Sequence, residues 1–127
     1  MDLKLQQYIN GKWMDANSGN KRHIINPFNQ EIIATVPEGD ESDAKVAIAA
    51  AREAFDNGGW ASTPATERGT IVTRIAELIE RDKEELAYLE SLDTGKTVEE
   101  SRGDMDDIAG VFRYYGELAD KDGGELI

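Results

Sequence analysis

The tripeptide Gly95-Lys96-Thr97 is the first feature of the sequence that could carry chemistry, because it matches the end of a phosphate-binding loop. Such a loop surrounds a phosphate with glycine amides, and its lysine reaches the terminal phosphate. The glycine that the motif requires five positions earlier is Glu90 here, and a helix rather than a strand is predicted before the motif. The end of one helix and the N-cap of the next therefore explain these residues better than nucleotide binding does.

Three aspartates, Asp104, Asp106 and Asp107, crowd one helical turn and could suggest a calcium site. Their spacing lacks the glycine and the distal glutamate of a helix-loop-helix calcium loop. On a helix, positions 104 and 107 are neighbours, whereas position 106 is not. We therefore predict a solvated polar face, with Met105 and Ile108 turned inward.

No set of side chains forms a recognisable catalytic group. The sequence has no cysteine, a single histidine (His23, in a predicted strand) and no Gly-x-Ser-x-Gly motif. Its 26 acidic residues make chance carboxylate pairs inevitable, so spacing alone assigns no glycoside-cleaving pair. Neither a nucleophile nor a general base is predicted in these 127 residues.

The composition indicates one acidic domain of ordinary size. With 127 residues, 39% of them hydrophobic, the chain can bury a core without disulfides or metal ions. Lys and Arg total 14 against 26 Asp and Glu, and the net charge of -12 repels nucleic acids and anionic lipid headgroups. There is no apolar run of about 20 residues and no signal peptide pattern. We expect a cytoplasmic protein without nucleic-acid or membrane partners.

Two short antiparallel β-hairpins are predicted over residues 1–39. Asn10-Gly11 lies between apolar-bearing arms, and both residues tolerate the positive φ of a type I′ turn. A second pair of strands is predicted from residues 23–25 and from the β-branched run 32–36, which Pro37 closes. The tetrapeptide Asn26-Pro27-Phe28-Asn29 separates these two strands.

Four α-helices are predicted over residues 40–120. The first begins at Asp40 and ends at Asn57-Gly58-Gly59, and its alanine-rich stripe is expected to pack closely. The second has Thr63 as N-cap and Pro64 at its first position. The apolar stripes of the first, second and fourth helices are Ala44, Ala47, Ile48, Ala51 and Phe55; Ile71, Ile75, Leu78 and Ile79; and Met105, Ile108, Phe112, Tyr115 and Ala119.

The corner between the third and fourth helices is locally well specified. The third helix is predicted over residues 84–92, and Gly95 follows it as a left-handed stop residue. Thr97-x-x-Glu100 is a capping box that opens the fourth helix. Farther along, residues 125–127 read as the start of another strand, so we expect the chain to be a piece of a longer protein.

Three separated motifs occur in order along the chain: Tyr8-Ile9-Asn10-Gly11-Lys12-Trp13, Ile25-Asn26-Pro27 and Leu89-Glu90-Ser91-Leu92-Asp93-Thr94-Gly95-Lys96. Together they resemble the aldehyde dehydrogenase superfamily. Residues 104–108 and 118–125 are similar to the bacterial members that oxidise betaine aldehyde to the osmoprotectant glycine betaine. The resemblance covers the whole chain and is more specific for the superfamily than for the substrate.

The resemblance implies an NAD-dependent α/β enzyme in which a cysteine thiolate attacks the aldehyde and hydride passes to the nicotinamide. It places the cysteine and the NAD-binding turn in later sequence, so no catalytic or NAD-binding residue is assigned here and the chain alone is expected to be inactive. Residues 1–127 would be the amino-terminal part of the NAD-binding domain of a homo-oligomer. In that part, hairpins occupy 1–39, helices 40–120 and the start of a further strand 125–127.

One binding site of the superfamily maps onto these residues. The resemblance implies that a potassium or sodium ion is held by the backbone carbonyls of Ile24 and Ile25 and by the carboxylate of Asp93. Carbonyl dipoles and one carboxylate supply hard oxygen ligands without the charge that a divalent ion favours. Capping of backbone amides at the corner is the alternative role for Asp93.

A second function remains open from the residues alone. The chain could be a free-standing acidic helical module that binds a partner protein through apolar surface and has no enzymatic activity. The two hypotheses differ in solution behaviour. A cooperatively folded, monomeric and soluble chain would favour the module, whereas aggregation or partial folding would favour a piece of an enzyme, because the apolar faces of the second and fourth helices would then lack their partner sheet.

Overall fold

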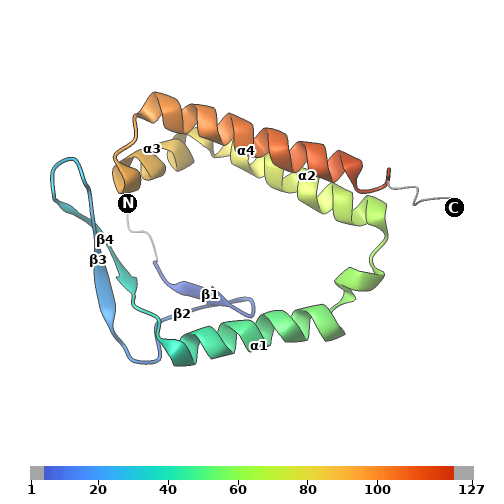
Figure 1. Ribbon diagram of the computed structural model, residues 1–127, viewed down its shortest axis with the longest axis horizontal. Helices are drawn as coiled ribbons and strands as arrows, with labels where there is room; N and C mark the ends of the chain where they lie inside the picture. Colours follow the sequence, from blue (N-terminus) through green and yellow to red (C-terminus); the bar gives the residue numbers. More distant parts are fainter. Residues whose placement is uncertain (1–4, 122–127) are drawn as a thin grey trace, which may run out of the picture. The chain divides into compact units, whose positions relative to one another are not determined.

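The computed structural model describes residues 5–121, which contain two antiparallel hairpins followed by four α-helices, as predicted (Figure 1). The chain divides into two compact units, one ending at Ala61 and the other beginning at Ser62. Each unit is described by itself. The strand predicted over residues 125–127 lies outside the described residues.

The first hairpin pairs β1 (Gln7–Ile9) with β2 (Lys12–Met14). Asn10 and Gly11 join the strands with φ values of 51° and 75°, which are the left-handed conformations expected of a type I′ turn. Opposite each other on the two strands, Tyr8 and Trp13 place their ring centroids 4.9 Å apart. The hairpin predicted from Asn-Gly is confirmed.

The second hairpin pairs β3 (Lys21–Ile25) with β4 (Ile32–Pro37). The register shifts between Ile24 and Ile25, because Ile33 has no partner on β3 and forms a bulge. Pro37 is the last residue of β4 rather than the residue that follows it.

The helix α1 (Glu41–Asn57) begins at a capping box formed by Asp40 and Asp43 and ends at Gly58. Asp43 also fixes α1 to the preceding loop, since its buried carboxylate accepts a hydrogen bond from the Asn17 amide at 3.0 Å. The predicted close packing of the alanine-rich stripe is wrong: Asp43 is the only buried residue of α1, and Ile48 and Phe55 are 69% and 67% exposed.

A short 3₁₀ helix, η1 (Gly59–Ser62), precedes α2 (Ala65–Arg81). Pro64 is the N-cap of α2 and no side chain caps the helix, so the prediction of Thr63 as N-cap and Pro64 as first helical residue is wrong by one position. The helix α3 (Lys83–Thr94) is one residue longer at its start and two at its end than predicted, and α4 (Val98–Leu118) follows the corner.

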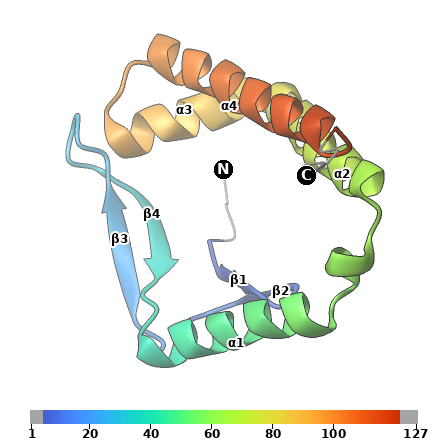
Figure 2. The same cartoon turned by 45° about the vertical axis from the view of Figure 1, so that its right-hand side comes forward.

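In the second unit, α2 and α4 lie side by side with opposite chain directions, and α3 packs against α4 (Figures 1 and 2). Small residues make up most of their contact: the buried set is Gly69, Ala76, Ala87, Ser101, Met105, Ala109 and Gly116. Met105 points inward as predicted. Ile108 and Tyr115 do not, because they are 38% and 60% exposed, and Ile71 and Ile75 of α2 are also exposed.

Candidate functional site

The corner between α3 and α4 is held by hydrogen bonds from residues that the sequence analysis selected. Gly95 adopts φ 77°, and its amide donates to the Ser91 carbonyl at 3.0 Å, which confirms the left-handed stop. The Ser91 hydroxyl donates to the Lys96 carbonyl at 2.6 Å. The Lys96 amide in turn donates to Oγ1 of Thr94 at 3.3 Å. The corner is thus closed on both sides of the glycine.

The ammonium group of Lys96 lies between two carboxylates. Its Nζ is 3.4 Å from Oε1 of Glu90 and pairs directly with Asp104. The hydrogen bond with Asp104 raises the pKa of Lys96, and the negative charges of Asp104 and Glu90 add to the effect. The sequence had suggested that Asp104 is a solvated acid. The structure shows instead that Asp104 is an ion-pair partner of Lys96. Because the lysine charge is already matched by protein carboxylates, the geometry does not support a phosphate-binding loop.

The capping box at the start of α4 is present as predicted. Oγ1 of Thr97 accepts a hydrogen bond from the Glu100 amide at 3.2 Å, and Oε2 of Glu100 accepts one from the Thr97 amide at 3.3 Å. Hydrogen bonds from the Thr97 hydroxyl and amide hold the pKa of Glu100 below its usual value. The corner therefore ends in a helix start whose amides have local partners.

The three residues implied as cation ligands belong to different units. Ile24 and Ile25 lie in β3 beside the bulge, in the first unit, and Asp93 lies in the last turn of α3, in the second. Asp93 is exposed, and within residues 5–121 its carboxylate makes no hydrogen bond or ion pair. The alternative role for Asp93 as a cap is not observed, since Oγ1 of Thr94 accepts the Lys96 amide instead.

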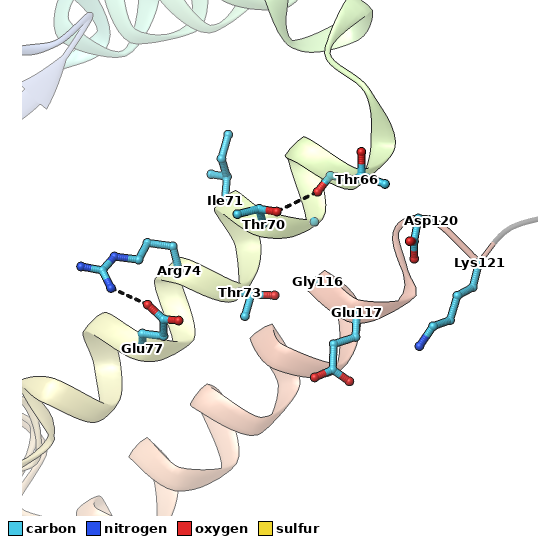
Figure 3. Close-up of a pocket in the computed structure, with 11 residues that line it drawn as sticks. Thr66, Thr70, Ile71, Thr73, Arg74, Glu77, Gly116, Glu117, Asp120 and Lys121 are labelled. Carbon is cyan, nitrogen blue, oxygen red and sulfur yellow. Dashed lines mark hydrogen bonds and ion pairs between the residues drawn. The ribbon is translucent and has the colours of Figure 1, made fainter.

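A groove of about 710 Å³ lies along the α2–α4 contact (Figure 3). The sequence analysis missed it, because it forms only where Gly69 and Gly116 bring the two helices together. Thr70 donates to the Thr66 carbonyl at 3.0 Å, and Arg74 pairs with Glu77. The groove is lined by Thr66, Gly69, Thr70, Ile71, Thr73, Arg74, Glu77, Gly116, Glu117, Asp120 and Lys121, a set without a cysteine or histidine for nucleophilic or acid–base chemistry.

Two kinds of feature are absent from the described part of the chain. Residues 5–121 contain no cluster of three His, Cys, Asp or Glu side chains that could hold a metal ion. Over the same residues, no helix has the length and apolarity needed to cross a membrane. The corner around Lys96 and the free carboxylate of Asp93 are therefore the features of greatest interest.

Comparison with known proteins confirms the resemblance seen in the sequence. Residues 13–127 match the aldehyde dehydrogenase family. The chain is 67% identical over 120 residues to betaine aldehyde dehydrogenase of Bacillus subtilis (strain 168), which covers 94% of this chain and 24% of that protein. It is 40% identical over 116 residues to aminoaldehyde dehydrogenase 2 of Zea mays, which covers 89% of this chain and 23% of that protein.

Solved structures give the same result for the fold. The crystal structure of betaine aldehyde dehydrogenase from Staphylococcus aureus in complex with NAD+ superimposes with a TM-score of 0.95 and 55% sequence identity, over 99% of this chain and 25% of that one. The chain thus spans about a quarter of the length of the relatives that it matches. From the family match over most of its residues, the chain belongs to the aldehyde dehydrogenase family.

Proposed function

We propose that the chain is the amino-terminal part of a longer NAD-dependent enzyme that oxidises betaine aldehyde to glycine betaine. The observation that carries the proposal is the 67% identity to the Bacillus betaine aldehyde dehydrogenase, against 40% to the maize aminoaldehyde dehydrogenase. The NAD+ held by the similar Staphylococcus enzyme supports the choice of cofactor. The free-standing module has no comparable support, since several large apolar side chains in each unit, such as Phe55 and Val111, are exposed.

In this enzyme, residues 1–127 provide the flank of the NAD-binding domain rather than reacting groups. NAD+ accepts the hydride when bound, and the remaining protein supplies the nucleophile, because this chain has no cysteine. The two small hairpins and the α2–α4 pair are elements that buttress a larger body. We further propose that the enzyme works in the cytoplasm as a homo-oligomer, and the net charge of -12 on these 127 residues favours solubility.

We also propose that the enzyme holds a potassium or sodium ion through the carbonyls of Ile24 and Ile25 and the carboxylate of Asp93. The donor chemistry fits, because Asp93 is exposed and its oxygens have no partner in residues 5–121. The bulge beside Ile25 interrupts the regular ladder at the strand end where the carbonyls are needed. Oxygen ligands with a single negative charge match a monovalent ion.

Steady-state kinetics of the longer protein test the proposed function. With NAD+, kcat/KM for betaine aldehyde is expected to exceed that for an uncharged aliphatic aldehyde of similar size by at least about tenfold, an order set by loss of about 1.4 kcal/mol of transition-state binding. The purified 127-residue chain, verified by intact mass, is expected to form no NADH. Aldehyde oxidation by that chain, or equal kcat/KM for both aldehydes, would contradict the proposal.

A further inference from the structure

The turn between β1 and β2 exposes an asparagine followed by a glycine (Figure 1). The pairing of Ile9 with Lys12 closes the ladder, so the peptide bond between Asn10 and Gly11 takes part in no ladder hydrogen bond. Within residues 5–121, neither the Gly11 amide nor the Asn10 side chain has a hydrogen-bond partner. The turn therefore presents a free backbone amide next to a free side-chain amide.

The space around Gly11 is open. A Cβ atom built at this residue would meet no heavy atom within 4 Å. Because glycine has no side chain of its own, nothing shields its nitrogen from the carboxamide of the preceding residue. Rotation of the peptide between Asn10 and Gly11 can bring the Gly11 nitrogen to Cγ of Asn10 without breaking a hydrogen bond of the hairpin.

We propose that Asn10-Gly11 is a site of spontaneous deamidation and isoaspartate formation. The Gly11 nitrogen gives its proton to solvent and attacks Cγ of Asn10, so that the N–Cγ bond forms, the Cγ–Nδ2 bond breaks and ammonia leaves with a proton from solvent. Water then opens the succinimide ring, adding its oxygen to one carbonyl carbon and a hydrogen to the nitrogen. Opening at Cγ leaves aspartate, whereas opening at the main-chain carbonyl leaves isoaspartate. The modification is independent of the proposed enzymatic activity.

An isoaspartate at position 10 is incompatible with the present hairpin, because the main chain then runs through Cβ and Cγ and becomes one carbon atom longer. A type I′ turn requires two ordinary residues with positive φ, here 51° and 75°. Turn length fixes the register, so the pairing of Tyr8 with Trp13, whose ring centroids are 4.9 Å apart, is lost. Chains with an open first hairpin are therefore expected to accumulate as the protein ages.

A second Asn-Gly dipeptide, Asn57-Gly58, provides an internal control in the same unit. It is also exposed, but the Gly58 amide donates to the Ala54 carbonyl at 3.0 Å and the Asn57 side chain donates to Glu53 at 2.9 Å. Both reacting groups are thus engaged in the last turn of α1, and these hydrogen bonds must break before attack. Loss of hydrogen bonds of ordinary strength slows a reaction by about tenfold.

The test is incubation of the complete enzyme that contains this chain, followed by peptide mass spectrometry at intervals. Conversion replaces NH₂ by OH and raises the peptide mass, and chromatography separates aspartyl from isoaspartyl peptides. In the folded enzyme we expect conversion at Asn10 to be at least about tenfold faster than at Asn57. In the enzyme unfolded in guanidinium chloride, the two rates should be similar, because both dipeptides are Asn-Gly. Equal rates in the folded enzyme, or conversion at Asn10 only after unfolding, would overturn the proposal.

Hydrogen exchange of the peptide carrying residues 7–14 tests the opening of the hairpin. In the isoaspartyl protein, exchange is expected to be at least about tenfold faster than in fresh enzyme. Asn10→Asp carries the added charge without the longer main chain, and Asp-Gly also suits a type I′ turn, so its exchange should match that of fresh wild type. Asn10→Gly lacks the reactive side chain but keeps a turn-forming pair, and its exchange should not change with time. Equally fast exchange in Asn10→Asp, or unchanged exchange in the isoaspartyl protein, overturns the opening of the hairpin.

Discussion

At the crossing of α2 and α4, Gly116 leaves no room for a side chain. A Cβ atom built there would lie 2.9 Å from both the Gly69 carbonyl oxygen and the Thr73 amide nitrogen, which are backbone atoms that cannot move alone. Gly116→Ala is therefore expected to push the helices apart and lower the free energy of unfolding by about 1–3 kcal/mol. Urea denaturation of the wild type and the variant measures this difference.

Gly110 provides the control on the same helix. A Cβ atom at Gly110 would meet no heavy atom within 4 Å, so Gly110→Ala tests the effect of a methyl group on helix propensity alone. In a helix interior, this change typically stabilises by up to about 1 kcal/mol. If the two substitutions lowered the free energy of unfolding equally, the close approach of α2 to Gly116 would not be the cause of the destabilisation.

The capping box of α4 provides a prediction at the level of the element. Thr97→Ala removes the oxygen that accepts the Glu100 amide at 3.2 Å, and the first turn of α4 then lacks a partner for one amide. The expected loss of unfolding free energy is about 1 kcal/mol. Thr97→Ser keeps the hydroxyl and is expected to recover most of the loss. A full loss in both variants would argue that the methyl group of Thr97 matters, and not its oxygen.

The same capping box gives α4 a dependence on acid. Hydrogen bonds from Thr97 lower the pKa of Glu100 from its ordinary value of 4.5, so folding favours the ionised carboxylate. This contribution to stability is fully present above pH 4.5 and is lost as the pH falls through the lower folded value. The stability gap between the wild type and Glu100→Gln is therefore expected to be constant from pH 7 to about pH 5 and to shrink in more acidic urea titrations. A gap that widens with acid would reverse the sign of this linkage.

Local signals explain why so many element boundaries could be predicted. Asn10-Gly11, Gly95 and the Thr97 capping box each fix backbone conformation through residues close in sequence, and each was found where the sequence indicated. The start of α2 shows the limit of such signals. Thr63 and Pro64 resemble a capped helix start, yet the proline itself takes the N-cap position.

The faces of the helices were predicted less well, because packing in the second unit follows small residues rather than large ones. The inward stripe of α4 includes Ser101, Ala109 and Gly116, whereas Ile108 and Tyr115 remain exposed. A stripe of large apolar residues predicts that one face of a helix is buried, but it does not predict which neighbouring element covers that face. Apart from Met105, the buried residues of α4 are small, whereas large ones such as Ile108 and Tyr115 remain exposed.

The candidate site could be predicted only in part for a related reason. Ile24 and Ile25 are implied as ligands through backbone carbonyls, and a carbonyl has no residue-type signature, so only the family resemblance suggests them. The partners of Lys96 lie six and eight residues away, on two helices, and the turn between them decides that they meet. Standard helical spacings of three or four residues do not reveal such a pair.

At the scale of the whole molecule, α4 presents a second apolar stripe that the second unit does not cover. Its members are Ile108, Val111, Tyr115 and Leu118, with exposed fractions from 38% to 60%. A surface of this kind binds another apolar surface in most proteins, within the same chain or in a partner. If the rest of a longer enzyme covers this stripe, one polar substitution must have opposite effects in the short and the long protein.

Val111→Glu tests this reversal of sign. In the isolated 127-residue chain, a charge at this position, 55% exposed, is expected to reduce self-association, seen as a lower apparent mass in sedimentation at high concentration. In the longer enzyme, the same carboxylate would be buried without a partner and is expected to lower the unfolding free energy by more than about 2 kcal/mol. Val111→Thr has nearly the same shape without the charge and should shift both measurements in the same directions but less. If Val111→Glu leaves the stability of the longer enzyme unchanged, the stripe faces solvent there too, and a partner protein becomes the better explanation for its apolar character.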